Sequence, residues 1–141
     1  MSVVKSILLM FAILPVLSSG LFLNTKCDVD VWPSEKRDPA VRVFEVPQEC
    51  NNGTFRWDYP QKTVHLKFLN HYRRQMSVCI RDGMLGDIFT VRDITHTLEM
   101  PMVIGEKESC TLKYHEAITL RIDAPETLYY VGSILYHVYE E

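Results

Sequence analysis

Histidines and cysteines are the side chains best suited to chemistry in this chain, and their spacing decides which chemistry is open to it. The five histidines are dispersed, at His65, His71, His96, His115 and His137. None has a cysteine or carboxylate at a spacing that predicts a nucleophile or a metal site. The sequence also lacks the nucleophile elbow, the H-E-x-x-H zinc motif and the phosphate-binding P-loop. We therefore expect no enzyme activity, no metal and no cofactor.

The four cysteines are Cys27, Cys50, Cys79 and Cys110. No pair has the C-x₂₋₄-C spacing of a zinc site, so two disulfides are the better interpretation of an even number of cysteines. The sequence alone permits three connectivities. We favour Cys27–Cys50 with Cys79–Cys110, because sequential pairing suits a meandering β-chain.

Residues 1–20 predict export from the cell. Lys5 precedes an apolar run from Ile7 to Leu17, and small residues follow it, which is the layout of a secretory signal peptide. The run is shorter than the roughly 20 residues of a membrane-spanning helix, and no later segment is long enough. We expect cleavage after Gly20, secretion of residues 21–141 into the extracellular space, and no membrane span. The formal net charge of -3 argues against nucleic acid as a partner.

Asn52 is a candidate glycosylation site. Asn52-Gly53-Thr54 satisfies the N-x-[ST] rule with no proline between the two polar residues. An exported chain passes the compartment in which this motif receives its sugar. The sequence therefore predicts an N-linked glycan on Asn52.

Short strand signals recur along residues 21–141, with turn residues between them. Val64, Leu66 and Phe68 alternate with polar residues, which is typical of a strand with one buried face. The Asp82-Gly83 pair predicts a tight hairpin turn. The expected strands are 41–46, 54–57, 63–69, 76–81, 87–92, 95–100, 109–114, 117–122 and 128–139. Their β-branched and aromatic residues predict a single all-β sandwich domain.

Acidic residues near glycines are possible ligands of a calcium ion. Asp82 and Asp87 each lie beside a glycine, and short acidic loops can supply oxygen ligands to calcium. Two carboxylates are too few for the roughly six to eight ligands that calcium takes. A turn-forming role is the better interpretation, with Asp93 and Asp123 as further candidates if calcium binds.

One short segment, His71-Tyr72-Arg73-Arg74, places an aromatic ring beside cations between two expected strands. Aromatic and arginine side chains anchor many protein interfaces. Tyr72, Arg73 and Arg74, together with Trp32 in another loop, are therefore the candidate contacts to a partner. A solvated loop tip is the alternative for this segment. Trp57 and Tyr59 are expected in the core instead.

The order of Cys50, Trp57-x-Tyr59-Pro60, an amphipathic strand and Val78-Cys79-Ile80-Arg81 resembles the amino-terminal CUB-like half of the meteorins, and Cys27 and Cys110 also find counterparts there. Meteorins are secreted animal signalling proteins. The resemblance implies a CUB-like β-sandwich of the jelly-roll type. It also implies a signalling ligand or modulator that binds an extracellular protein or cell-surface receptor.

Two features of that family have no counterpart in these residues. Meteorins continue into a second, cysteine-rich domain, so activities that need that domain do not carry over. The acidic pattern through which many CUB domains bind calcium is not recognisable here, which argues against calcium-dependent binding.

Two other functions suit the same features. A venom or defence effector would have the same small, disulfide-bonded build, and the tissue of expression would separate it from a signalling factor. A carrier of a small apolar ligand is the third hypothesis, with Met84, Met100 and Met102 lining its cavity. A ligand-free mass in native mass spectrometry would count against the carrier.

Overall fold

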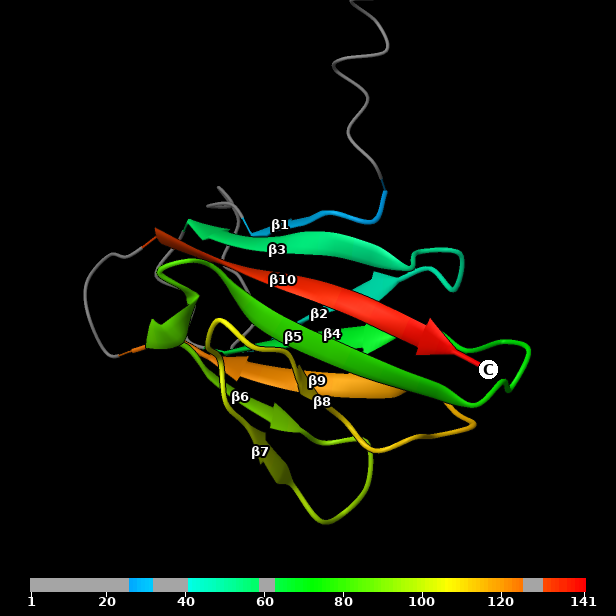
Figure 1. Ribbon diagram of the computed structural model, residues 1–141. Coiled ribbons are helices and arrows are strands. Elements are labelled where there is room, and N and C mark those ends of the chain that lie inside the picture. The colour runs from blue at the N-terminus through cyan, green and yellow to red at the C-terminus, as the bar shows by residue number, and fades with distance from the viewer. Residues whose placement is uncertain (1–25, 32–40, 59–62, 126–130) are drawn as a thin grey trace, which may run out of the picture.

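The computed structural model describes residues 26–31, 41–58, 63–125 and 131–141 (Figure 1). The predictions for the signal peptide, Trp32 and Tyr59 lie outside these residues. Within them the strands are β1 (Val29–Val31), β2 (Val41–Val46), β3 (Asn52–Asp58), β4 (Thr63–Phe68), β5 (Met76–Met84), β6 (Thr90–Asp93), β7 (Met100–Met102), β8 (Ser109–Cys110), β9 (Ile118–Asp123) and β10 (Val131–Glu140). A short 3-10 turn, η1 (Gly86–Ile88), lies between β5 and β6.

The strands form two five-stranded sheets that face each other. Sheet A has the order β1-β3-β10-β5-β8, and sheet B has the order β2-β4-β9-β6-β7. In Figure 1, β10 and β5 of sheet A lie in front of β4 and β9 of sheet B. The predicted all-β sandwich with two disulfides is confirmed.

The chain crosses between the sheets at most of its connections. Among the described strands, β6 and β7 are the one pair that is both consecutive and hydrogen-bonded. The strands β1 and β3 pair in parallel, as do β2 and β4. The expectation of a meander is therefore wrong, because a strand that buries one face can do so equally well in either layer.

Both predicted disulfides are present, although the chain does not form the meander from which they were predicted. Cys27 and Cys50 each lie two residues before the start of the parallel neighbours β1 and β3, and their Cα atoms are 5.3 Å apart. Cys79 and Cys110 are directly paired residues of β5 and β8, with Cα atoms 3.9 Å apart. Together the bonds fix both edge strands of sheet A.

Alternate residues of the strands fill the space between the sheets. Val64, Leu66 and Phe68 are buried as the alternation predicts. Trp57 is fully buried, stacks on Phe89 with ring centroids 5.2 Å apart and meets Phe55 edge-on at 5.7 Å. The prediction that Trp57 belongs to the core is confirmed.

The expected turn at Asp82-Gly83 is wrong, because β5 continues to Met84. No described glycine has a positive φ, so Gly83 does not adopt the turn conformation that this dipeptide favours. A Cβ atom on Gly83 would lie 2.6 Å from the Ser133 hydroxyl oxygen. The glycine instead allows β10 to approach closely, and the chain turns at Leu85, whose φ is 54°.

The expected strand over 95–100 is also wrong in most of its length. The Asp93 carboxylate accepts a hydrogen bond from the Thr95 N–H at 3.0 Å, which folds the chain into a turn. Strand β7 begins only at Met100. Similarly, the expected strand over 109–114 is reduced to Ser109–Cys110, and the short β1 was not expected at all.

Two tyrosines tie distant segments to the sheets. The Tyr136 hydroxyl donates to the Cys27 carbonyl, and the Tyr114 hydroxyl donates to Asp93 Oδ2 at 2.7 Å. Burial raises the pKa of both phenols to about 12, and the carboxylates of Asp28 and Asp93 add to the shifts. Both groups are therefore held neutral in the folded state.

These pKa shifts predict alkaline destabilisation. An unfolded tyrosine has a pKa of about 10, so the stabilisation is complete below pH 10 and is lost as the pH rises towards 12. For the buried Tyr136 the loss is on the order of 2 kcal/mol. Urea unfolding at pH 9, 10 and 11 measures it. We expect a shallower pH dependence in Tyr136→Phe and Tyr114→Phe, and an unchanged slope in both would contradict the assignment.

Candidate functional site

Three segments far apart in the sequence meet at one end of the sandwich, where the C-terminus lies in Figure 1. The turn between β2 and β3 is joined to the loop between β4 and β5 by the Leu69 N–H, which donates to the Val46 carbonyl at 3.0 Å. The end of β10 joins the same loop, because the Glu141 N–H donates to the Gln75 carbonyl at 3.0 Å. Residues 70–74 of this loop are called the Tyr72 loop below.

The Tyr72 loop is held from within by Asn70, which is 8% exposed. Asn70 Oδ1 accepts the Arg74 N–H at 3.1 Å, and Asn70 Nδ2 donates to the Arg74 carbonyl at 2.8 Å. One amide side chain thus satisfies both backbone groups of the residue at the far side of the loop. The loop is closed without help from a partner.

Gln48, in the turn between β2 and β3, holds the same loop from outside. Its Nε2 donates to Asn70 Oδ1 at 3.1 Å, and its Oε1 accepts the Tyr72 N–H at 3.2 Å. On the other side His115 Nδ1 lies 3.1 Å from the Arg73 carbonyl. The loop is therefore fixed by side chains of two neighbouring segments.

Tyr72 stands at the tip of this fixed loop and is 75% exposed. The Arg74 guanidinium lies 5.6 Å from the centroid of the Tyr72 ring, and Arg74 Nη1 lies 3.6 Å from Glu140 Oε2. Arg73 has a φ of 49°, a left-handed backbone that is uncommon for a residue with a side chain. Strain of this kind persists only where the surroundings fix the backbone.

A concavity lies on each side of the loop. The first, of about 460 Å³, is lined by Gln48, Glu49, Asn51, Tyr72, Arg74 and Glu140. The second, of about 500 Å³, is lined by Asn70, Arg73, His115, Glu116 and Ala117. The ring of Tyr72 lines the first hollow, and the neighbouring Arg73 lines the second.

The charges around the two concavities are of mixed sign. Glu140 Oε1 is buried and accepts no hydrogen bond from a described residue. Arg73 forms no ion pair within the described part of the chain, whereas Glu116 lies 2.7 Å from His96 and Glu49 is paired with Lys26. The hydrogen bond from Lys26 lowers the pKa of Glu49. The second concavity therefore offers a cation at Arg73.

Three of the four residues predicted to bind a partner, Tyr72, Arg73 and Arg74, come together in this loop. The fourth, Trp32, lies outside the described residues. The residues that support the loop, Asn70 and Gln48, were not anticipated. An asparagine directly after a strand was the available signal for Asn70, since its side chain readily bonds to nearby backbone.

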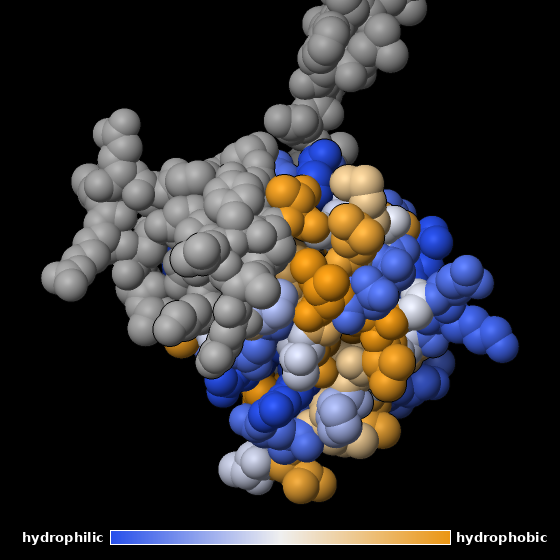
Figure 2. Space-filling view, turned by 90° about the vertical axis from the view of Figure 1, so that its left-hand side faces the viewer, coloured by the Kyte–Doolittle hydropathy of each residue, from blue (hydrophilic) through white to orange (hydrophobic). Residues whose placement is uncertain are grey.

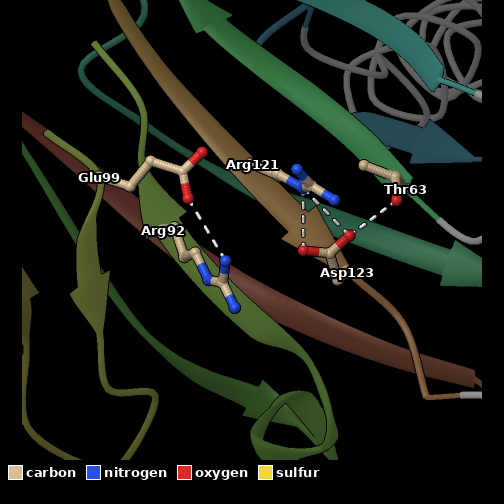
Figure 3. A network of polar contacts seen from close by, with 5 residues as sticks. All are labelled: Thr63, Arg92, Glu99, Arg121 and Asp123. Atoms are coloured by element: carbon tan, nitrogen blue, oxygen red, sulfur yellow. Dashed lines mark hydrogen bonds and ion pairs between the residues drawn. The ribbon is translucent and has the colours of Figure 1, made fainter. Parts of the chain in front are cut away.

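Three of the four carboxylates considered for calcium have partners within the protein. Asp82 Oδ1 accepts the Gly86 N–H at 2.7 Å, so its side chain closes the turn that follows β5 and not a hairpin turn at Asp82-Gly83. On the outer face of sheet B, Asp123 accepts hydrogen bonds from Thr63 at 2.7 Å and from Arg121 at 3.0 Å (Figure 3). In Figure 3 a neighbouring pair joins Arg92 to Glu99. Asp93 is buried beneath Tyr114.

A metal at Cys79, Glu108 and Cys110 is also unsupported. Among the described residues these three form the one group of potential ligands with atoms close enough to share an ion. Both sulfurs belong to a disulfide, so neither is a thiolate that can bind a metal.

The methionines proposed to line a carrier cavity do not lie together. Met84, at the end of β5 in sheet A, is exposed, whereas Met100 and Met102 belong to β7 in sheet B. Met84, Leu85, Ile88 and Val131 are all exposed. Figure 2, which views the left-hand side of Figure 1, shows hydrophobic side chains among polar ones. Within the described residues no helix is long and apolar enough to cross a membrane.

The fold and site define a disulfide-bonded sandwich of two five-stranded sheets with a fixed loop at one end. The sequence matches no protein family and no curated protein. Among solved structures, the chain is similar to a mutant of PliG, a periplasmic inhibitor of g-type lysozyme from Escherichia coli, with 5% identity and a TM-score of 0.46 over 79% of this chain and 97% of that chain.

PliG from Salmonella Typhimurium gives 7% identity and a TM-score of 0.46 over the same shares, 79% and 97%. The pre-peptidase C-terminal domain of a collagenase from Bacillus anthracis gives 10% identity and a TM-score of 0.42 over 74% of this chain and 100% of that chain. Similarity at this level carries no argument about function or partner.

Proposed function

We propose that this chain is an exported, non-enzymatic binding module that recognises an extracellular protein through the Tyr72 loop. One observation carries the proposal: Tyr72 is 75% exposed at the tip of a loop that Asn70 and Gln48 hold in place. Ordering a loop on association costs free energy, so a loop ordered in advance favours tight binding. The two disulfides support passage through an oxidising compartment.

The surroundings of the loop suggest the chemistry of the partner surface. Arg73, which forms no ion pair within the described residues, suits a carboxylate of the partner. The partner surface would therefore carry a carboxylate near a pocket for one aromatic ring. A cell-surface receptor, bound by a signalling ligand or modulator, is the partner class that the meteorin resemblance suggests.

Tyr72→Ala should weaken binding to cells that bind the wild-type protein by at least about tenfold, which corresponds to about 1.4 kcal/mol. The loss comes from removing the exposed ring, so Tyr72→Phe should retain most of the affinity. Binding of labelled, oxidised protein to cells from its own source organism measures both. Val103→Ala is the control, because Val103 is 77% exposed and directly follows β7 of sheet B.

The proposal fails if binding is saturable but unchanged in Tyr72→Ala and in Arg73→Ala. It also fails if the oxidised protein shows no saturable binding to any cell type of that organism. Circular dichroism of each variant separates a lost contact from a lost fold.

A further inference from the structure

We infer that an N-linked glycan on Asn52 lies with its first sugar in a concavity on the outer face of sheet A. Asn52 is exposed and begins β3. Phe55 and Trp57 of the same strand point into the core, so by alternation Asn52 lies on the opposite, outer face. The inference concerns this face and is independent of the Tyr72 loop.

The concavity beside Asn52 has a volume of about 390 Å³. Its lining includes Asp28, Asn52, Arg81, Glu108, Leu135 and His137. Carboxylates and a guanidinium group offer acceptors and donors for sugar hydroxyls, and Leu135 provides a small apolar floor. The lining therefore has the mixed polar character that a pyranose ring requires.

An aromatic platform lies next to Asn52. His137 is the direct cross-strand partner of Asn52, and its ring stacks on Tyr139 with centroids 4.1 Å apart. The Tyr139 hydroxyl donates to Glu108 Oε2 at 3.0 Å, which fixes the pair. The C–H groups on one face of a pyranose carry partial positive charge and are attracted to the negative face of an aromatic ring. Direct cross-strand partners have Cβ atoms about 5 Å apart, within reach of a sugar attached to Asn52.

The order of synthesis keeps Asn52 accessible to the transferase. In the folded protein Asn52 pairs with His137 of β10, which follows it by 85 residues in the chain. The sequon therefore enters the secretory lumen before this partner strand is made. The transfer needs a lipid-diphosphate-linked oligosaccharide: Asn52 Nδ2 forms a bond to sugar C1 and loses one proton, while the bond from C1 to the diphosphate oxygen breaks.

A matched pair of variants tests the inference. Protein secreted from a eukaryotic host is compared as wild type, Thr54→Ser, which keeps the sequon, and Thr54→Ala, which removes it. The sugar of the glycosylated forms is trimmed to a single N-acetylglucosamine. Intact mass is expected to show the sugar on the wild type and Thr54→Ser only.

Acylation of histidines by diethylpyrocarbonate then reports where the sugar lies. We expect His137 to react several-fold more slowly in the two glycosylated forms than in Thr54→Ala, because the sugar covers its ring. His96, in the connection between β6 and β7, is the internal control and should react equally in all forms. In Tyr139→Ala the sugar mass should persist while the protection of His137 weakens.

Two results would overturn the inference. The first is a wild-type mass without sugar, and the second is a sugar on Asn52 with no protection of His137. Neither depends on partner binding, so the failure of this inference and of the proposed function are distinguishable.

Discussion

Replacing Trp57 with alanine should lower the free energy of unfolding by about 3–5 kcal/mol, the usual cost of removing a large buried aromatic ring. Trp57 is 0% exposed and packs against Phe89 at 5.2 Å and Phe55 at 5.7 Å between ring centroids. The variant loses these contacts and leaves a cavity between β3 and the segment that leads into β6. Small domains are stable by only about 5–15 kcal/mol, so a large part of the total is lost.

Urea unfolding followed by circular dichroism, with the disulfides intact, measures this change. Trp57→Phe keeps a ring in the same space and should be clearly more stable than Trp57→Ala. Leu98→Ala is the surface control, because Leu98 is 76% exposed and its removal should change stability by no more than about 0.5 kcal/mol. A loss below about 1 kcal/mol in Trp57→Ala would contradict the central place of this ring in the core.

The inner faces of the sandwich could be predicted from the sequence because burial follows a period of two along a strand. Val64, Leu66 and Phe68 were assigned correctly for this reason, and so was the strand that contains Trp57. The same period says which face is buried but not which strand lies alongside. The alternation of the chain between two sheets was therefore not predictable.

The errors in strand boundaries arise where contacts of side chains override the backbone hydrogen bonds expected between paired strands. Asp93 folds the following residues into a turn through its contact with Thr95, although residues 95–100 have strand-like composition. Gly83 lies within β5, where its lack of a side chain allows Ser133 of β10, 50 residues later in the chain, to approach closely. Both outcomes depend on three-dimensional neighbours that local sequence patterns do not contain.

The candidate site was predictable in its exposed part alone. Tyr72 and its neighbouring arginines could be assigned to a loop by their polarity and their position between two strands. Besides Asn70, the loop contacts Gln48 and Glu140, which are distant in sequence and meet the loop because β3 begins and β10 ends at the same end of sheet A.

Replacing Asn70 with alanine is expected to damage the site while leaving its exposed residues in place. The change removes the acceptor of the Arg74 N–H, the donor to the Arg74 carbonyl and the acceptor of Gln48 Nε2. Leaving buried polar groups unpaired costs about 1–3 kcal/mol, so the free energy of unfolding should fall by that amount. The amide hydrogen of Arg74 should exchange with solvent much faster than in the wild type.

Binding to the partner should weaken by about tenfold in Asn70→Ala, because the partner must now order the loop at a cost of about 1.4 kcal/mol. His71→Ala is the stability control, since His71 is exposed in the same loop and should change the free energy of unfolding by no more than about 0.5 kcal/mol. Fast exchange at Arg74 with unchanged binding would show that the partner orders the loop itself. Slow exchange would show that Gln48 and His115 suffice to hold the loop without Asn70. The binding surface depends on Asn70 only if loop exchange and affinity change together.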